Sequence, residues 1–163
     1  IIAGPLTAEA FQPFGQVLLV PTSKGRVTYE ERLENGRPQA RASLSLSRAE
    51  PMAGTRLAVT EMERHHYSSQ SFVPIRVSRY LIVVAPHAPG GGPDTSRARA
   101  FVAGPGQGVT YACNTWHHGL TVLDGPAEFA VFMWRDGSQG DEEFVPVAAP
   151  FTVVAPNRGG APS

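Results

Sequence analysis

The sequence predicts an all-β protein, built as a sandwich or closed barrel of many short strands with few and short helices. Seventeen glycines and fifteen prolines are spread through the 163 residues and leave little room for long helices. Between them, short runs either alternate apolar with polar residues or consist of branched apolar residues, as half-buried and buried strands do. Many short strands separated by glycine- and proline-bearing turns are typical of a sandwich or a closed barrel.

The strands expected from these patterns are Gly15–Val20, Ser43–Ser47, Arg56–His65, Ser71–Ile75, Tyr80–Ala85, Arg99–Ala103, Gly108–Tyr111, Leu120–Leu123 and Glu128–Trp134. One short helix is expected over Thr7–Phe11, because Thr7 can cap its N-terminus and Pro13 disfavours helical geometry just beyond it. Two polar or glycine-rich segments, Ser23–Arg41 and His87–Arg97, are expected to be loops.

Length and composition predict a single domain over residues 1–163, with residues 156–163 as a flexible tail. Fourteen basic side chains balance fourteen acidic ones, which argues against a nucleic-acid partner because phosphate binding needs a concentrated basic surface. No apolar stretch approaches the ~20 residues of a membrane span, so no membrane partner is expected. The single cysteine, Cys113, excludes an internal disulfide, and we expect a cytoplasmic protein without a signal peptide.

Four of the five histidines form two adjacent pairs, and the first pair follows two glutamates. If Arg56–His65 is extended, Glu61, Glu63 and His65 project from one face together with the apolar Leu57 and Val59. Two carboxylates and an imidazole are costly to bury there unless they are paired or bind a metal. Alternatively, this strand end lies at the barrel rim, where Glu61 stays hydrated and Glu63 pairs with a nearby arginine.

The second histidine pair follows a glycine- and asparagine-containing turn. Consecutive residues of a strand point to opposite faces, so His117 and His118 should not both enter one cavity. Tyr111 and Trp116 can form walls of a pocket or belong to the core.

The first cluster and the later histidine pair together resemble a modified pair of cupin motifs. In the cupin superfamily a His-x-His, a later glutamate and a distant histidine hold a divalent metal inside a double-stranded β-helix, or jelly-roll, barrel. Here Glu63 takes the place of the first histidine, His65 matches the second, Gln70 replaces the glutamate, and one of His117 and His118 matches the last. The resemblance implies a cupin-type barrel with a metal site.

A finer resemblance is to the ureidoglycolate lyase family, and it covers most of the chain. The segments that carry it are Pro5–Thr7, Phe14–Gly15, Glu63–His65, Ser68–Ile75, Arg99–Phe101, Gly106–Tyr111, Trp116–His118, Phe129–Val131 and Met133–Gly137. Two positions depart from the family pattern: His66 and Gly119 stand where the family usually has proline.

The resemblance implies a lyase that cleaves (S)-ureidoglycolate into glyoxylate and urea in the breakdown of allantoin and purines. One carbon of this substrate carries a carboxylate, a hydroxyl and a urea nitrogen, so the reaction removes the hydroxyl proton and protonates the departing nitrogen. His65 is the first candidate for the general base or a metal ligand, with Glu63 orienting it or sharing the metal. One histidine of the second pair supplies the acid or the second ligand, and we assign His118 as the acid and His117 as the ligand.

The resemblance also implies substrate contacts, a metal and an assembly. Two arginines could grip the carboxylate, two polar residues could bind the ureido group and two aromatic residues could wall the pocket: Arg64, Arg79, Gln70, Ser69, Tyr111 and Trp116. Arg64 is in addition a candidate catalytic residue. A divalent metal, nickel or zinc, would be held by Glu63, His65, Gln70 and His117, and no organic cofactor is expected. A homodimer is expected from the family, with Leu120–Leu123 as an apolar strand that could contribute.

Two alternatives share this barrel. One is a metal-dependent isomerase or dioxygenase acting on another small acid, since Glu63, His65 and one later histidine could supply a two-histidine, one-carboxylate set. The other is a non-catalytic cupin that binds a small molecule in its pocket.

Overall fold

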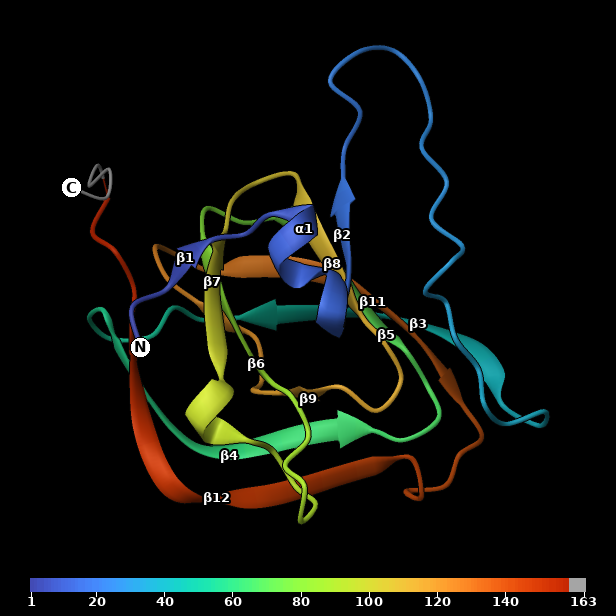
Figure 1. Ribbon diagram of the computed structural model, residues 1–163. Helices are drawn as coiled ribbons and strands as arrows, with labels where there is room; N and C mark the ends of the chain where they lie inside the picture. Colours follow the sequence, from blue (N-terminus) through green and yellow to red (C-terminus); the bar gives the residue numbers. More distant parts are fainter. Residues whose placement is uncertain (159–163) are drawn as a thin grey trace.

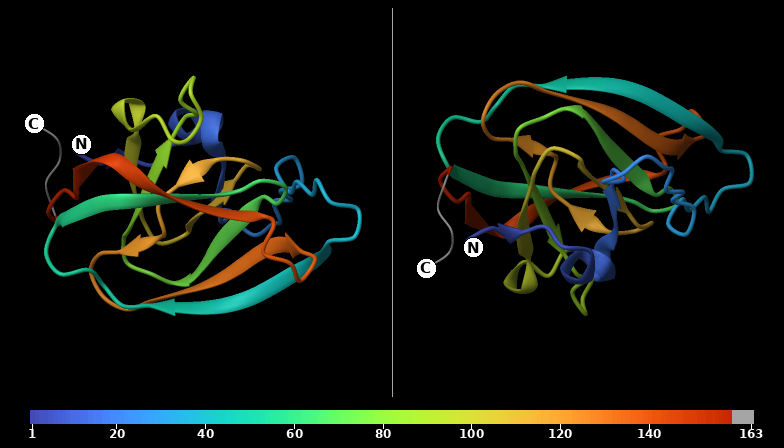
Figure 2. Two further views of the ribbon diagram at one scale, coloured as in Figure 1. Left: turned by 90° about the horizontal axis from the view of Figure 1, so that it is seen from below. Right: turned by 90° about the horizontal axis from the view of Figure 1, so that it is seen from above.

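The computed structural model describes residues 1–158, whose strands form two sheets that face each other (Figures 1 and 2). The first sheet contains β1 (Gly4–Pro5), β4 (Arg56–His65), β6 (Tyr80–Ala85), β7 (Arg99–Ala103), β9 (Trp116–His117), β10 (Thr121–Val122) and β12 (Glu142–Val154). The second contains β2 (Gly15–Leu19), β3 (Arg41–Ala49), β5 (Gln70–Arg76), β8 (Gln107–Tyr111) and β11 (Ala127–Arg135). The helices are α1 (Ala8–Phe11) and the short 3-10 turns η1 (Gln12–Phe14) and η2 (Thr95–Arg97).

The strand order is β1-β7-β6-β9-β4-β12 in the first sheet, with β10 paired to β6, and β2-β8-β5-β11-β3 in the second. This arrangement confirms the predicted all-β, cupin-type barrel with few short helices. The predicted helix is present, and Thr7 caps it by accepting a hydrogen bond from the Ala10 amide at 3.2 Å. Among the described residues, no helix has the length and apolar character needed to cross a membrane.

Strand β12 is the longest strand and was not predicted, because Pro146 and Pro150 lie within it. A proline cannot donate to a ladder hydrogen bond, so a strand that contains two of them is not expected at the centre of a sheet. In the structure β12 is an edge strand: it pairs with β4, its last residue Val154 also bridges to Ile2, and its register with β4 breaks between Pro146 and Phe151. Both prolines are therefore tolerated where pairing is one-sided or interrupted.

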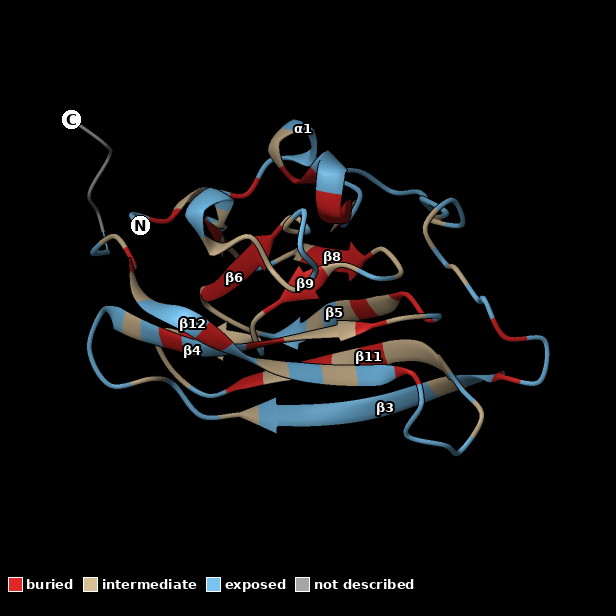
Figure 3. Ribbon diagram, turned by 60° about the horizontal axis from the view of Figure 1, so that its bottom comes forward, coloured by how far each residue is buried: buried red, intermediate tan, exposed pale blue. Residues whose placement is uncertain are grey.

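Strand β6 lies at the centre of the molecule and is buried along its whole length (Figure 3). Tyr80, Ile82 and Val84 belong to a core between the two sheets. The alternate residues Leu81 and Val83 belong to a second core with residues of β4 and β12. A strand buried on both faces needs apolar residues at every position, which explains the continuous apolar run of β6.

Strand β4 divides its residues between the core and the barrel interior. The expectation that Leu57 and Val59 share a face with Glu63 and His65 is wrong. Val59 packs in the second core together with Met62, three residues later, so the alternation shifts between them opposite the irregular part of β12. The first half of β4 therefore builds the core, and its last residues are free to carry polar chemistry.

One surface expectation also changes, and part of the predicted tail lies within the described residues. Leu120–Leu123 is not an exposed apolar strand, because Val122 is buried and Leu120 packs against the core between the sheets. Of the tail expected over 156–163, the carbonyl of Pro156 accepts a hydrogen bond from Arg79 and Arg158 lies 3.4 Å from Asp124, while 159–163 fall outside the described residues.

Candidate active site

Glu63, His65 and His117 meet inside the barrel. Glu63 and His65 come from the end of β4, and His117 comes from β9, where it lies opposite Glu63 in the ladder. One nitrogen or oxygen atom of each side chain lies within 4.8 Å of the other two. The cluster is well shielded from solvent, with the side chains of His65, His117 and Glu63 exposed by 4 %, 2 % and 16 %. The structure therefore answers which residue of the second histidine pair faces this cluster: it is His117.

The orientation of His117 is fixed by two contacts. Its Nδ1 donates a hydrogen bond to the Thr115 carbonyl at 2.9 Å, and its ring stacks on Tyr111 with centroids 4.1 Å apart. Nε2 then points at Glu63 Oε1, 3.2 Å away. In the neutral ring this nitrogen carries a lone pair, so two acceptors face each other unless a proton or a metal ion lies between them.

His65 is held from the side opposite to Glu63. Its Nδ1 lies 3.5 Å from Asp141 Oδ2. The other oxygen of Asp141 accepts hydrogen bonds from the amides of Tyr67 and Ser68, at 2.8 and 3.1 Å. Arg37 closes the network, with contacts of 2.8 Å to Asp136 and 3.5 Å to Asp141.

The surroundings shift the pKa values of three of these groups. Burial lowers the pKa of His65 and the charge of His117 lowers it further, against the raising effect of Asp141 and Glu63. Burial raises the pKa of Glu63, but close contact with His117 outweighs it and leaves the pKa below its ordinary value. Burial also raises the pKa of Tyr111 well above its ordinary value. At neutral pH the site thus holds a carboxylate, an uncharged His65 and a protonated phenol.

Several buried polar atoms around this cluster have no hydrogen-bond partner within the described part of the chain. They are both ring nitrogens of His65, His117 Nε2, Gln70 Oε1, the Tyr111 hydroxyl, Arg37 Nε and Asp141 Oδ2. Leaving such atoms without partners is costly, so their concentration at one place indicates a site built to receive a polar ligand. A carboxylate and two imidazoles are suitable ligands for a divalent metal, with Gln70 as an adjacent amide donor. The residues present therefore fit the metal site that the cupin resemblance implies.

A cavity of about 310 Å³ adjoins the cluster on the His65 side. Its lining comes from the loop before β3, from β3, β4, β5 and β11, and from the turn into β12: Arg37, Ser45, His65, Gln70, Val131, Met133, Arg135, Ser138, Gln139, Asp141 and Glu142. Most of these residues are polar or charged. Gln70, predicted as a ligand and a substrate contact, lies in this cavity beside His65.

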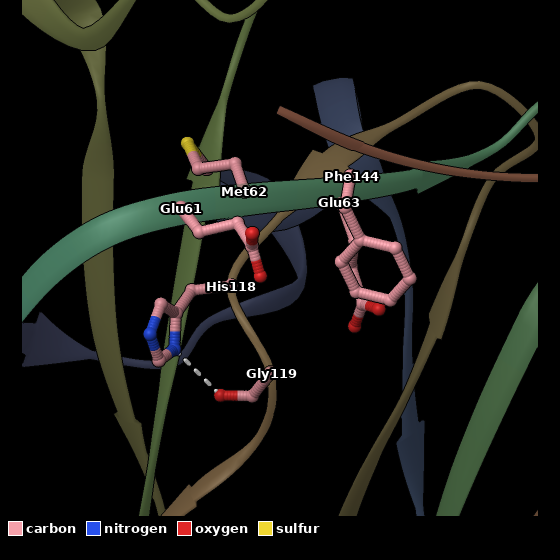
Figure 4. A pocket seen from close by; sticks show the side chains of 6 residues that line it. All are labelled: Glu61, Met62, Glu63, His118, Gly119 and Phe144. Atoms are coloured by element: carbon pink, nitrogen blue, oxygen red, sulfur yellow. Dashed lines mark hydrogen bonds between the residues drawn. The ribbon is translucent and has the colours of Figure 1, made fainter. Parts of the chain in front are cut away.

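A second cavity, of about 210 Å³, lies on the Glu63 side (Figure 4). It is lined by Glu61, Met62, Glu63, His118, Gly119 and Phe144. The Nδ1 of His118 donates to the Gly119 carbonyl at 2.7 Å. The predicted acid His118 thus lies next to Glu63 but in a different cavity from His65.

Three other predicted site residues face away from the cavity beside His65. The Arg64 guanidinium bonds to Glu143 at 2.6 Å and lies 4.4 Å from the Trp116 ring, on the opposite side of β4 from Glu63. Trp116 is fully buried in the second core. Arg79 forms two hydrogen bonds to Asp124, at 2.7 and 2.8 Å, at the opposite end of β6 from the strand's pairing with His117.

Ser69 is also engaged elsewhere. Its hydroxyl accepts a hydrogen bond from the Glu34 amide at 2.9 Å and so ties the long loop between β2 and β3 to the start of β5. Glu34 in turn accepts a hydrogen bond from the Cys113 amide at 2.6 Å, in the turn that leads to His117.

No pattern in the sequence pointed to Arg37, Asp141 or Arg135 at this site. Asp141 approaches His65 because β12 pairs with β4, with Glu142 opposite His65. Arg37 comes from the long loop, about a hundred residues away from Asp136 and Asp141 in the chain. The pairing of β12 with β4 brings Asp141 to His65, and the pairing of β3 with β11 brings Arg37 to Asp136.

Comparison with known proteins shows which family the chain is similar to. The ureidoglycolate lyase family model matches residues 1–154. A ureidoglycolate lyase from Chelativorans sp. (strain BNC1) is 35 % identical over 97 % of this chain and 98 % of its own. A ureidoglycolate lyase from Burkholderia cepacia is 40 % identical over 87 % of this chain and 83 % of its own. Among solved structures, a dTDP sugar isomerase from Desulfovibrio desulfuricans G20 aligns over 83 % of this chain and 84 % of its own, with 20 % identity and a TM-score of 0.49. The family match and the similarity to these lyases identify the chain as a member of the ureidoglycolate lyase family.

Proposed function

We propose that this protein is a lyase that cleaves (S)-ureidoglycolate into glyoxylate and urea, a step in the breakdown of allantoin and purines. The observation that carries the proposal is the family match over residues 1–154. The buried cluster of Glu63, His65 and His117 beside a polar cavity supports it, because this reaction needs proton transfer at a shielded site. The isomerase, dioxygenase and non-catalytic alternatives have no comparable support.

His65 is the proton acceptor that the geometry offers to a substrate in the cavity. It lines the cavity, it is uncharged at neutral pH, and Asp141 stabilises the positive charge that it gains. Taking the proton from the substrate hydroxyl at Nε2 allows the carbonyl of glyoxylate to form as the bond to nitrogen breaks. Returning this proton from Nε2 to the departing nitrogen completes the release of urea.

Gln70 and Tyr111 are proposed to bind the departing half of the substrate. Gln70 Oε1 has no partner among the described residues and can accept a hydrogen bond from a urea N–H. The Tyr111 hydroxyl also lacks a partner there, and its raised pKa keeps it a donor, suited to the urea nitrogen as charge develops on it.

Nickel or zinc is the proposed metal, held by Glu63, His65 and His117 with Gln70 nearby. When bound, such an ion would lower the pKa of the substrate hydroxyl and neutralise charge on the substrate. His65 as a ligand and His65 as the base are alternatives. They differ in one respect that can be measured, namely whether turnover persists after chelation.

We further propose a cytoplasmic homodimer. The dimer is supported by the outward face of β3, where Leu44 and Leu46 are 69 % and 75 % exposed. β3 is also the edge of its sheet, and exposed edges with apolar side chains tend to be covered by another chain.

The deciding experiment measures glyoxylate and urea release from racemic ureidoglycolate, before and after chelation. His65→Ala should abolish release of both products. His66→Gln is the matched control, because His66 pairs with Glu143 outside the cluster, and it should retain activity. A folded, metal-replete protein that releases neither product would refute the lyase proposal.

A further inference from the structure

Two arginines lie side by side where β3 and β11 pair, and one of them lines the cavity that contains His65. Arg135 is the last residue of β11 and lines this cavity. Arg41, the first residue of β3, lies directly opposite Arg135 in the antiparallel ladder. Directly opposite residues project from the same face, so the two positive side chains are neighbours. Like charges in this arrangement repel and destabilise the sheet.

The surrounding acidic residues do not compensate this charge. Within residues 1–158, no carboxylate oxygen lies within 4.0 Å of a guanidinium nitrogen of Arg41 or Arg135. Asp136 and Asp141 are instead in contact with Arg37, and Glu142, which lines the same cavity, lies more than 4.0 Å from both guanidinium groups. Arg64 and Arg79, by contrast, each have a carboxylate partner. Positive charge without a partner at the wall of a polar cavity favours an anionic ligand.

We propose that Arg135, with Arg41 beside it, binds the carboxylate of the substrate. This inference rests on the proposed function, in which the substrate is a small carboxylate with a ureido group. The planar guanidinium donates two parallel hydrogen bonds to a carboxylate, which fixes its orientation as well as its position. With the carboxylate at Arg135, the rest of the molecule extends into the cavity toward His65 and Gln70. Arg41 adds charge rather than a required hydrogen bond. Arg135 is therefore a specificity-determining residue.

Calorimetric titration with oxalurate tests this without relying on turnover. Oxalurate keeps the carboxylate and the ureido group of the substrate but has a carbonyl in place of the carbinol, and its neutral amide, oxaluramide, serves as the uncharged comparison. The wild-type protein should bind oxalurate more tightly than oxaluramide. Arg135→Gln should weaken oxalurate binding by ~10- to 100-fold and leave oxaluramide binding unchanged. Arg135→Lys should recover part of the loss, and Arg41→Gln should cause a smaller one.

Controls separate binding from folding. Arg97→Gln, an exposed arginine on η2 without a carboxylate partner in the described chain, should bind oxalurate like the wild type. The Tm of Arg135→Gln should be unchanged or higher, because the substitution relieves the repulsion with Arg41.

The proposal is overturned if the wild type does not prefer oxalurate to oxaluramide, or if Arg135→Gln weakens both equally. Failure of the lyase assignment looks different. A protein that binds oxalurate through Arg135 but releases no glyoxylate from ureidoglycolate would refute the lyase and retain the carboxylate site. A protein that cleaves ureidoglycolate normally, but whose oxalurate binding does not depend on Arg135, would refute the carboxylate site and retain the lyase.

Discussion

Replacing Asp141 by asparagine should impair catalysis more than it impairs folding. Asparagine keeps an oxygen that can accept the amides of Tyr67 and Ser68, so the turn after His65 should stay in place. The second oxygen, which faces His65 Nδ1 and Arg37, becomes an NH₂ group. This donor opposes the N–H of the required His65 tautomer and therefore disturbs the orientation of the ring.

The expected stability loss is moderate because Arg37 keeps its 2.8 Å contact with Asp136. Loss of the 3.5 Å contact to Arg37 leaves one charged group less well paired. This costs about 2 kcal/mol, or roughly 4–8 °C in Tm for a domain of this size. The effect on kcat/KM should be about 10- to 100-fold, as for other partners that orient a catalytic or metal-bound histidine.

Asp136→Asn is the matched control, measured for kcat/KM toward ureidoglycolate and for Tm in thermal unfolding. It weakens the shorter contact of Arg37 and lies outside hydrogen-bond reach of His65, so it should lower Tm while kcat/KM changes little. If both variants lose activity in proportion to their loss of Tm, Asp141 acts only through folding and the positioning argument is refuted.

Three further outcomes are expected. Excess nickel or zinc at ~100 times its Kd should stabilise the wild type by about 2.7 kcal/mol, roughly 5–11 °C in Tm. A chelator or the substitution His117→Ala should remove this gain in stability. An equal gain in His117→Ala would contradict the proposed ligand set. The double variant Leu44→Lys, Leu46→Lys should convert a dimer into a monomer by light scattering, and an unchanged mass would exclude this face as the interface. The hydrogen bonds from Arg79 lower the pKa of Asp124, so their stabilisation is present above the unfolded pKa of ~3.9 and is lost as pH falls below it. Arg79→Gln should therefore lower Tm at pH 7 by an amount that shrinks toward pH 3. A difference in Tm that stays constant between these pH values would mean that the charge of Asp124 contributes nothing to it.

Local pattern was sufficient for most strands because burial dictates their composition. Tyr80–Ala85 is apolar at every position since both faces of β6 are buried, and Arg56–His65 was predicted with its observed bounds. Pattern failed for β12, whose prolines are compatible with a strand because they lie on an edge strand, at the break in its register with β4. Which strand lies at the edge of a sheet depends on residues far apart in the chain, so no short stretch of sequence shows it.

The candidate site, like the fold, was predictable only where local alternation along a strand determines the orientation of side chains. Alternation along β4 places Glu63 and His65 together and turns Arg64 away, and the structure agrees on both points. The partners of these residues could not be predicted, because the sequence alone does not show which acidic residue an arginine pairs with in the fold. Arg64 and Arg79 are both satisfied by distant acids, so neither is available to a substrate.

Within one strand, the residues that form the core and the residues that line the site lie at different positions. A substitution therefore affects mainly the stability of the protein or mainly its binding of ligand, according to its position. In β4, Val59 and Met62 are fully enclosed in a core, whereas His65 is the last residue of the strand and borders a cavity. In β11, Phe129 packs between the sheets, whereas Arg135 ends the strand beside an unpaired like charge. Polar groups that are unfavourable for folding are thus concentrated at strand ends, where few core contacts depend on them. Substitutions of Arg135 and Gln70 should therefore alter binding at nearly constant stability. Asp141 is the exception, because its carboxylate both ties the turn after His65 and orients the imidazole.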